Sequence, residues 1–544
     1  MDKKTKTKSF ITYLIPILIA GMLKIFVSPM DITPFNADEA IVALMARHIN
    51  QGNIPVFFYG QAYMGSLDAM LVSIGFRFFG EAVWVIRLVQ GVLYLGTVLT
   101  TMMMAHRLIG SQRAVLYAGL IMAVPTINVT LYSTVSLGGY GEMLLVGNLL
   151  LLGGISTIKQ IRDCETRLGR RIYWGLFLWG IGAGFAFWIT GLTLVYSLPV
   201  IILIVWNLIR KKSWEVFLPG LILLFGGVIG SSAWWLTAVQ TGDLRIFSEL
   251  AGGAIKGAGT GLLLTRPLSR TLNLFVFGGT ALLGLRPPWE IRWLMLPLLP
   301  IILIFWLSVL VFSVKKMIEQ KEYRAINILA LMGLILTAGF IFSPYGDDPS
   351  GRYFLPLMVP MAIYGANLLV TQFKERRILE YVAITLVLVF NIGGTFQSVK
   401  LNPPGITTQF DKVAQVDQRY MDELIAFLDD NQIRAGYTNY WVSYPLAFLS
   451  EEKLIFVPRL PYHEDFRYTA RDDRYSPYQA IVNAESNPAY ITTRHPELND
   501  YLREQFFSKG INWEERSVGD FQIFYNLSDP VHAVDLGLGV TTNP

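Results

Sequence analysis

Long apolar blocks separated by short polar connectors fill the chain from residue 10 to residue 396. Each block holds roughly 18–25 residues, the length that a helix needs to cross a bilayer. The pattern predicts a polytopic α-helical membrane protein with about eleven spans. We expect these spans around residues 10–28, 84–105, 112–128, 140–158, 173–189, 191–209, 214–238, 291–314, 325–343, 353–372 and 378–396.

The connectors between the blocks alternate in charge. Residues 130–139 contain no lysine or arginine. Basic residues gather instead at the N-terminus and in residues 106–113, 159–171, 210–212, 315–324 and 374–377. Because basic connectors stay on the cytoplasmic side of a cell membrane, we expect the N-terminus inside. No small-residue cleavage site follows the first block, so we expect a retained helix. An odd number of spans then places everything after Phe396 outside.

The first long outer region, residues 29–83, contains two helical segments that we do not expect to cross the membrane. Ala37–Asn50 has its apolar residues on one stripe, which is typical of a helix lying at the membrane surface. Met64–Phe79 is apolar but short, and Asp68 and Arg77 interrupt it. Counting it as a span would put every later basic connector outside, so we expect it to lie along the surface as well.

The second outer region, residues 239–290, is rich in glycine at 251–261 and carries Arg266, Arg270 and Arg286. These arginines are expected outside, where the positive-inside rule predicts few basic residues. Either the region is a mobile loop, or the arginines have a specific anionic partner.

The composition becomes polar after the last apolar block. The periodicity there predicts helices near 419–430 and 497–507 and strands at 489–493 and 521–526. We therefore expect two domains, a membrane domain over residues 1–398 and a small extracytoplasmic α/β or α+β domain over residues 399–544.

The overall composition excludes several classes of protein. Only 16% of the residues are charged and 53% are hydrophobic, whereas soluble domains carry roughly 25% charged residues. The single cysteine, Cys164, excludes an internal disulfide, and the five histidines lack the spacing of a metal site. We expect no metal ion. The net charge of +5 does not indicate a nucleic-acid partner, because topology distributes the basic residues of a membrane protein.

Two adjacent acids open the first outer helix. Asn36 and Glu39 have the spacing of a capping box, and both Asp38 and Glu39 suit the positive end of the helix dipole. Alternatively, a carboxylate fixed at the membrane surface could act as a general base toward an incoming hydroxyl. The residues alone leave both interpretations open.

Polar groups beside glycines or aromatic rings mark two further outer segments. In residues 57–65, Tyr59 and Gln61 are either membrane-surface anchors or one wall of a sugar site. In residues 137–142, Tyr140 and Glu142 either cap a helix or face a ligand pocket.

The outer segment at residues 345–353 ends in Arg352 and Tyr353. Its two aspartates suit a solvated turn better than a metal site. Arg352 lies on the side that is poor in basic residues, and a guanidinium is well suited to grip a phosphate group. We expect Arg352 and Tyr353 to contact substrate.

The segment ADEAIVALMARHINQGNIPVFFYGQAYMGSLDAMLVSIGFRFFGEAVWVIRLVQ resembles the C-type glycosyltransferases, and later GGYGE and GRYFLPLMVP do so too. The likeness is strongest to the protein O-mannosyltransferase and lipid A aminoarabinose transferase branch. In that family an acid opens a surface helix in the first outer loop, and an arginine, here Arg87, enters the next span. The likeness is specific over residues 35–90 and architectural over residues 10–400.

The resemblance implies an integral-membrane transferase that moves a sugar from a polyprenyl-phosphate donor to an acceptor hydroxyl on the outer face, with inversion. It implies no metal or other cofactor, makes Asp38 the general base and leaves Glu39 as the fallback. We expect Arg352, helped by Arg266 or Arg270, to hold the donor phosphate. The remaining residues expected in the substrate site are Tyr59, Gln61, Tyr140, Glu142 and Tyr353. The acceptor can be a glycan, a lipid or a protein.

A transporter or lipid flippase is the main alternative function, and a membrane scaffold for the outer domain is another. A transporter predicts ionisable or broken sites near mid-membrane and an internal repeat. We find no convincing repeat, and the candidate acids lie near the outer ends of the spans. The sequence therefore favours glycosyl transfer.

Overall fold

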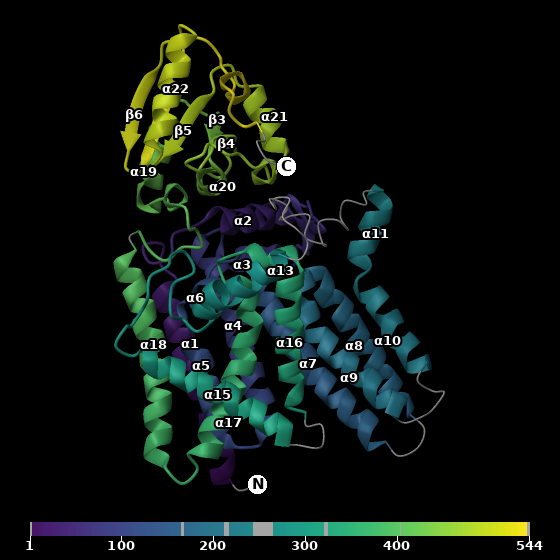
Figure 1. Cartoon of the computed structure of the whole chain (residues 1–544). Coiled ribbons are helices and arrows are strands. Elements are labelled where there is room, and N and C mark those ends of the chain that lie inside the picture. Colours follow the sequence, from purple (N-terminus) through teal and green to yellow (C-terminus); the bar gives the residue numbers. More distant parts are fainter. Residues whose placement is uncertain are drawn as a thin grey trace.

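A helical bundle with a mixed α/β domain at one end makes up the computed structural model (Figure 1). The structure describes residues 3–164, 168–210, 217–242, 265–319, 325–402 and 404–540. The glycine-rich stretch at 251–261 lies outside these residues. Within them, eight helices are long and apolar enough to cross a membrane, or up to nine if a bent pair forms one span. The chain is a multi-pass membrane protein, as the apolar blocks predicted.

The long helices of the bundle match the predicted blocks closely. They are α1 (Lys3–Val27), α4 (Val83–Ile109), α7 (Tyr140–Asp163), α8 (Arg170–Ile189), α9 (Leu194–Arg210), α15 (Leu299–Glu319), α17 (Met358–Gln372) and α18 (Arg377–Leu401). The short turns η1 (Gly191–Thr193) and η6 (Arg352–Leu357) extend α9 and α17 at their starts.

Four predicted spans differ from a single helix of the expected length. The block at 112–128 divides into α5 (Gln112–Ala123) and α6 (Ile127–Tyr132), because Pro125 cannot continue a helix. The block at 325–343 forms α16 (Asn327–Phe342), which is shorter than the other spans. In the block at 291–314, helix α15 begins only after Pro297.

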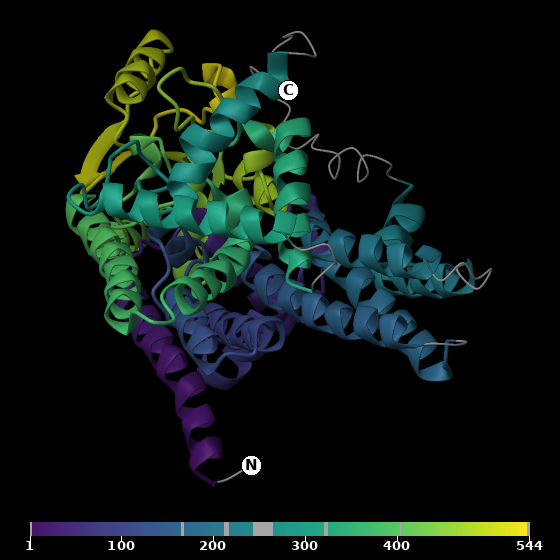
Figure 2. The same ribbon diagram turned by 60° about the horizontal axis from the view of Figure 1, so that its bottom comes forward.

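The block at 214–238 forms α10 (Phe217–Gly230) and α11 (Ser232–Thr241), which are bent by 61° relative to each other. Helix α10 packs on α8 through glycines spaced four residues apart on both helices. A Cβ at Gly230 would lie only 2.0 Å from the carbonyl oxygen of Ile181. The small residues therefore let the two backbones touch, as in many membrane helix pairs. Helices α8, α9 and α10 form a group that projects from one side of the bundle (Figure 2).

The first outer region folds over the end of the bundle. It contains α2 (Ala37–Asn50), the hairpin β1 (Phe57–Phe58) and β2 (Gln61–Gly65), and α3 (Leu67–Phe79). In Figure 1, α2 lies across the end of the bundle and beneath the α/β domain. The surface helix predicted there is buried on nearly every side, because α20 (Tyr440–Leu449) packs on the face away from the bundle.

The α/β domain is built on a five-stranded sheet in the order β4-β3-β5-β7-β6. Strand β3 is parallel to both β4 and β5, and β7 is antiparallel to its neighbours. The strands are β3 (Ala435–Thr438), β4 (Ile455–Pro458), β5 (Ala489–Thr493), β6 (Glu514–Val518) and β7 (Phe521–Tyr525). The helices are α19 (Met421–Asp430), α20, α21 (Pro477–Asn483) and α22 (Pro496–Ser508). Every element predicted in this region is present.

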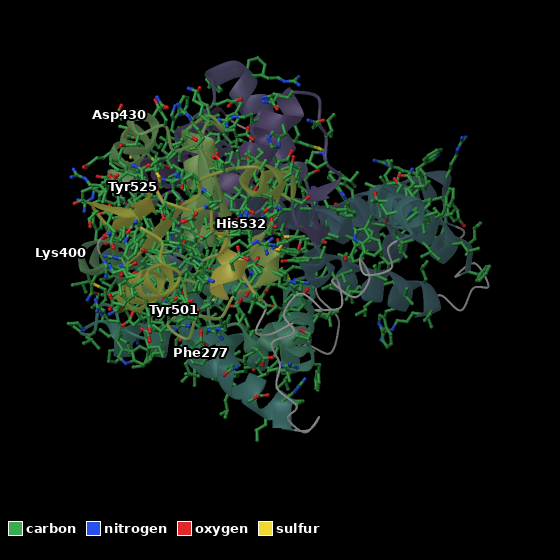
Figure 3. The ribbon with its side chains drawn as sticks, turned by 90° about the horizontal axis from the view of Figure 1, so that it is seen from above. Phe277, Lys400, Asp430, Tyr501, Tyr525 and His532 are labelled. Carbon is green, nitrogen blue, oxygen red and sulfur yellow. The ribbon has the colours of Figure 1, made fainter. Side chains whose placement is uncertain are left out.

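The parallel strands of the sheet direct their carboxyl ends toward the bundle. Helix α20 follows β3 directly and packs on α2, so the loop ends after β3 and β4 reach the first outer region. In α/β sheets this edge is where ligands bind. Seen from above, the domain that carries Asp430, Tyr501 and His532 covers one side of the bundle and leaves the group of α8 to α10 uncovered (Figure 3).

The remaining described elements connect these parts. They are α13 (Thr265–Asn273), the π-helical turn η4 (Leu274–Gly279), α14 (Thr280–Leu282), and the short turns η5 (Pro344–Asp347), η7 (Lys412–Ala414), η8 (Gln418–Tyr420), η9 (Ala470–Asp472) and η10 (Ala533–Leu536).

Candidate active site

A cavity of about 730 Å³ lies where the bundle, the β1–β2 hairpin and the α/β domain meet. One part of its wall is apolar and comes from α8, η1, α9 and α16. The apolar lining residues are Phe187, Leu192, Leu194, Val195, Leu198, Ile335, Leu336 and Phe340. The other part is polar and contains Asp38, Gln61, Tyr63, Tyr140, Tyr345, Arg352, Tyr353, Arg471, Asp472 and Arg474. The cavity therefore joins a hydrocarbon-like surface to a charged one.

Asp38 lies in the first turn of α2 and lines the cavity. The Asn36 side chain caps the helix by accepting a hydrogen bond of 2.9 Å from the backbone N–H of Glu39. The cap fixes the backbone from which the Asp38 carboxylate extends. The Tyr440 hydroxyl of the α/β domain donates a hydrogen bond to Asp38 Oδ1 at 2.5 Å. Burial and the nearby Asp38 raise the pKa of Tyr440, so its hydroxyl keeps the proton that it donates.

Glu39 faces the opposite way and is fully buried. Arg87 holds its carboxylate with two hydrogen bonds, from Nε to Oε1 at 3.1 Å and from Nη2 to Oε2 at 2.9 Å. The same guanidinium also donates to the backbone oxygen of Ser28. The predicted helix cap at Asn36 is thus present, but Arg87 holds the Glu39 carboxylate that would complete a capping box. Of the two acids, only Asp38 lines the cavity.

Arg352 enters the cavity from the turn between η5 and η6. Gly351 before it has φ of +77°, a left-handed backbone that favours glycine. Arg352 pairs with Asp348 at 2.6 Å and lies over the ring of Tyr353. Its buried Nε has no hydrogen-bond partner among the described residues. A guanidinium with a spare donor at the edge of an apolar cavity is suited to an anionic group.

The β1–β2 hairpin brings Gln61 and Tyr63 to the polar wall. When the Gln61 amide is oriented to satisfy its neighbours, its oxygen accepts from both terminal nitrogens of Arg474, at 2.5 and 2.7 Å. Burial raises the pKa of Tyr63, while Arg474, Arg352 and Arg471 oppose this shift. All three guanidiniums are therefore close enough to act on one hydroxyl.

The α/β domain supplies site residues that the sequence analysis did not identify. They are Tyr440, which follows β3, and Arg471, Asp472 and Arg474, which follow β4. Both groups come from the carboxyl edge of the parallel strands, where a ligand site is expected once the topology is known. The cluster of charges in residues 471–474 was the one available signal in the sequence.

Two of the residues predicted to contact the sugar, Tyr59 and Glu142, lie outside the cavity lining. The Tyr59 hydroxyl bonds His48 Nδ1 at 2.8 Å, and its ring stacks on Tyr475, where α2 meets the α/β domain. Glu142 is buried against Asp68, whose other partners are Gln90 and Ser136. Burial raises the pKa of Asp68. Tyr59 and Glu142 therefore support the walls of the site.

The other two predicted phosphate ligands, Arg270 and Arg266, do not line the cavity, and neither does the third arginine of this region, Arg286. Arg270 makes two hydrogen bonds to Asp347, at 3.1 and 2.9 Å, which identifies the anionic partner that its outer position required. Arg286 is buried and donates to backbone carbonyls, including that of Pro349. Arg266 is not among the residues described as lining the cavity. No cluster of three potential metal ligands occurs within the described part of the chain.

Comparison with known proteins identifies the architecture. No family model and no curated sequence matches the chain. Among solved structures, ArnT from Cupriavidus metallidurans bound to undecaprenyl phosphate superposes with a TM-score of 0.55 and 13% identity, covering 95% of this chain and 98% of ArnT. The apo state of ArnT gives a TM-score of 0.56.

The archaeal oligosaccharyltransferase AglB from Archaeoglobus fulgidus, in complex with an inhibitory peptide and a dolichol-phosphate, is also similar. Its TM-score is 0.53 at 12% identity, covering 97% of this chain and 75% of AglB. The chain has the C-type glycosyltransferase fold. The resemblance noted in the sequence is thus confirmed as a shared architecture over nearly the whole chain.

Proposed function

We propose that the protein is a membrane glycosyltransferase that takes a sugar from a polyprenyl-phosphate donor. The observation that carries the proposal is that Asp38 and Arg352 lie on the polar wall of one cavity whose opposite wall, from α8, η1, α9 and α16, is apolar. A carboxylate, a guanidinium and a hydrocarbon surface are the groups that a lipid-phosphate sugar and an attacking hydroxyl require. The shared fold with ArnT, which was solved with undecaprenyl phosphate, supports the same donor class.

The donor lies with its prenyl chain on the apolar wall formed by α9 and α16. Its phosphate meets Arg352, whose unpartnered Nε provides a further donor. Tyr353 and Tyr140 line the cavity beside it, and Gln61 and Tyr63 face the sugar from the hairpin. Tyr59 and Glu142 act on the sugar only through the walls that they support.

Transfer proceeds by attack of an acceptor hydroxyl on the anomeric carbon. Asp38 takes the hydroxyl proton, the new C–O bond forms, and the bond from the anomeric carbon to the phosphate oxygen breaks with inversion. The electron pair of the broken bond leaves on the phosphate. Arg352 stabilises that growing charge more in the transition state than in the ground state, which accelerates the step.

The proposed orientation places the α/β domain on the extracytoplasmic face. The N-terminus and the α/β domain lie at opposite ends of the bundle (Figure 1). The basic connectors then face the cytoplasm, and the cavity opens near the outer leaflet. Protease protection of the α/β domain in inside-out vesicles, and its loss in right-side-out cells, tests this orientation.

The activity is tested with membranes that contain the full chain and a polyprenyl-phosphate hexose labelled in the sugar. Glycosyl transfer predicts that the label leaves the lipid and that polyprenyl phosphate accumulates. A transporter or flippase would move the intact donor between leaflets and release none. Membranes that lack the protein give the background, and no release above it from any donor would contradict the proposal.

A further inference from the structure

Asp472 is a buried carboxyl group without a partner of its own. Its residue is only 8% exposed, and its side chain lines the cavity. Among the described residues, no hydrogen bond or ion pair is recorded for its two carboxylate oxygens, although its neighbour Asp473 pairs with Arg459 at 3.3 Å. Burial raises the pKa of Asp472 to about 7, opposed by Arg474. The carboxyl group therefore has its hydrogen-bonding capacity open to whatever fills the cavity.

The loop that presents Asp472 is held rigidly. The buried Tyr444 hydroxyl donates to the backbone oxygen of Asp472 at 2.9 Å and accepts from the backbone N–H of Arg474 at 2.5 Å. Arg474 also grips Gln61 and lies over the ring of Tyr440, yet its buried Nε has no partner among the described residues. One fixed loop therefore offers the cavity a free acceptor and a free donor side by side.

The charges around this loop exclude some ligands. The carboxylates of Asp38 and Asp472 oppose a second anionic group, and Arg471 and Arg474 oppose a cationic one. Paired carboxylate and guanidinium groups beside an aromatic ring instead match neighbouring hydroxyls, which both donate and accept. Arg474 lies over the ring of Tyr440, and the Tyr440 hydroxyl donates to Asp38. The pair therefore lies in the same cavity as the proposed base and close to it, on the acceptor side.

We propose that Asp472 and Arg474 form an acceptor subsite for a neutral, polyhydroxylated glycan. Asp472 accepts a hydrogen bond from one acceptor hydroxyl, and Arg474 donates to its neighbour. The pair orients the acceptor so that a third hydroxyl reaches Asp38. This inference rests on the proposed glycosyl transfer and specifies the class of acceptor.

The test compares Asp472→Asn with the matched variant Asp473→Asn in the purified full chain. The acceptor probes are a neutral alkyl glucoside, an alkylamine and an alkyl phosphate, with labelled polyprenyl-phosphate hexose as donor. We expect the wild type to use the glucoside. At pH 8, where Asp472 is largely ionised, Asp472→Asn should raise the KM for the glucoside about 10- to 100-fold, the effect of a lost hydrogen bond to a charged group, and leave the donor KM unchanged. Asp473→Asn should leave both constants unchanged.

The outcomes separate this inference from the proposed function. If the wild type releases polyprenyl phosphate but Asp472→Asn leaves the acceptor KM unaltered, the subsite is wrong and the transferase remains. Preference of the wild type for the alkylamine or the alkyl phosphate also overturns a neutral acceptor. If the wild type cleaves no donor, the proposed function itself fails. Direct binding of the glucoside to Asp472→Asn as tight as to the wild type again contradicts the subsite.

Discussion

The hydroxyl of Tyr440 donates a hydrogen bond to Oδ1 of Asp38 across 402 residues of sequence. This bond joins the α/β domain to the first turn of α2, and it orients the carboxylate that we propose as the general base. The α/β domain therefore contributes directly to the proposed active site.

Replacing Tyr440 by phenylalanine removes that donor and leaves the ring. The carboxylate of Asp38 then loses the hydrogen bond that orients it, so kcat/KM should fall about 10-fold while Tm stays near the wild-type value. Tyr437→Phe, whose hydroxyl bonds His532 within the domain, is the control and should keep the wild-type kcat/KM. A loss of activity that follows a fall in Tm would indicate a structural role only.

Glu39→Gln should lower the free energy of unfolding without affecting the transfer step. It leaves the buried Arg87 without a counter-charge, which costs about 3–5 kcal/mol of unfolding free energy. The yield and Tm of the variant in detergent should fall. The double variant Glu39→Met with Arg87→Met removes both charges and should recover Tm. A folded Glu39→Gln protein with wild-type Tm and no transfer would make Glu39 the base instead.

Arg352→Gln should lower the catalytic efficiency with the donor. Losing a charge-assisted hydrogen bond to phosphate corresponds to about 1.5–3 kcal/mol, so kcat/KM for the donor should fall at least 10-fold. Arg352→Lys should recover only part of this, because a lysine lacks the planar fork. Arg270→Gln tests the rival phosphate ligand, and its pairing with Asp347 predicts lower Tm with an unchanged donor KM. The reverse result would assign the phosphate to Arg270.

The raised pKa of the Asp472 carboxyl group predicts that the free energy of unfolding depends on pH. Its pKa is raised from 3.8 to about 7 by burial, and Arg474 and Asp38 are the charged groups that act on it. The folded state thus holds a proton that the unfolded state releases, and stability falls as pH rises from about 4 to about 7. The whole effect is at most roughly 4 kcal/mol, at about 1.4 kcal/mol for each pH unit.

Asp472→Asn should therefore be more stable than the wild type at pH 8 and similar near pH 4. The measurement is Tm in detergent at both pH values. An equal Tm difference at the two pH values would show that the carboxyl does not titrate in this window. Asp417→Asn is the control, because the Arg419 guanidinium lowers the pKa of Asp417, and it should show no gain at pH 8.

Periodicity and charge bias predicted the parts of the fold that local sequence controls. The long spans, the strand at 489–493 and the helix at 37–50 all lie where the apolar patterns placed them. About eleven spans were predicted, whereas eight or nine helices among the described residues are long and apolar enough to qualify. A proline such as Pro125 interrupts hydrogen bonding within a helix without changing the hydrophobicity of the block.

The sequence predicted only those residues of the site that lie in recognisable local segments. Asp38, Gln61 and Arg352 belong to segments that the family resemblance covers, and they do meet in one cavity. Tyr440 and Asp472 could not be placed, because only the tertiary packing of the α/β domain on α2 brings them to Asp38. Tyr59 is aromatic and lies in the right loop, but its stacking on Tyr475 draws it out of the cavity.

The most direct test of the account is single-turnover transfer from labelled polyprenyl-phosphate hexose by Asp38→Asn, with exposed Asp31→Asn as the control. We expect Asp31→Asn to match the wild type. Asp38→Asn should still bind the donor but transfer about 10²- to 10⁴-fold more slowly, the usual contribution of a general base. Equal transfer by Asp38→Asn and the wild type would contradict the account.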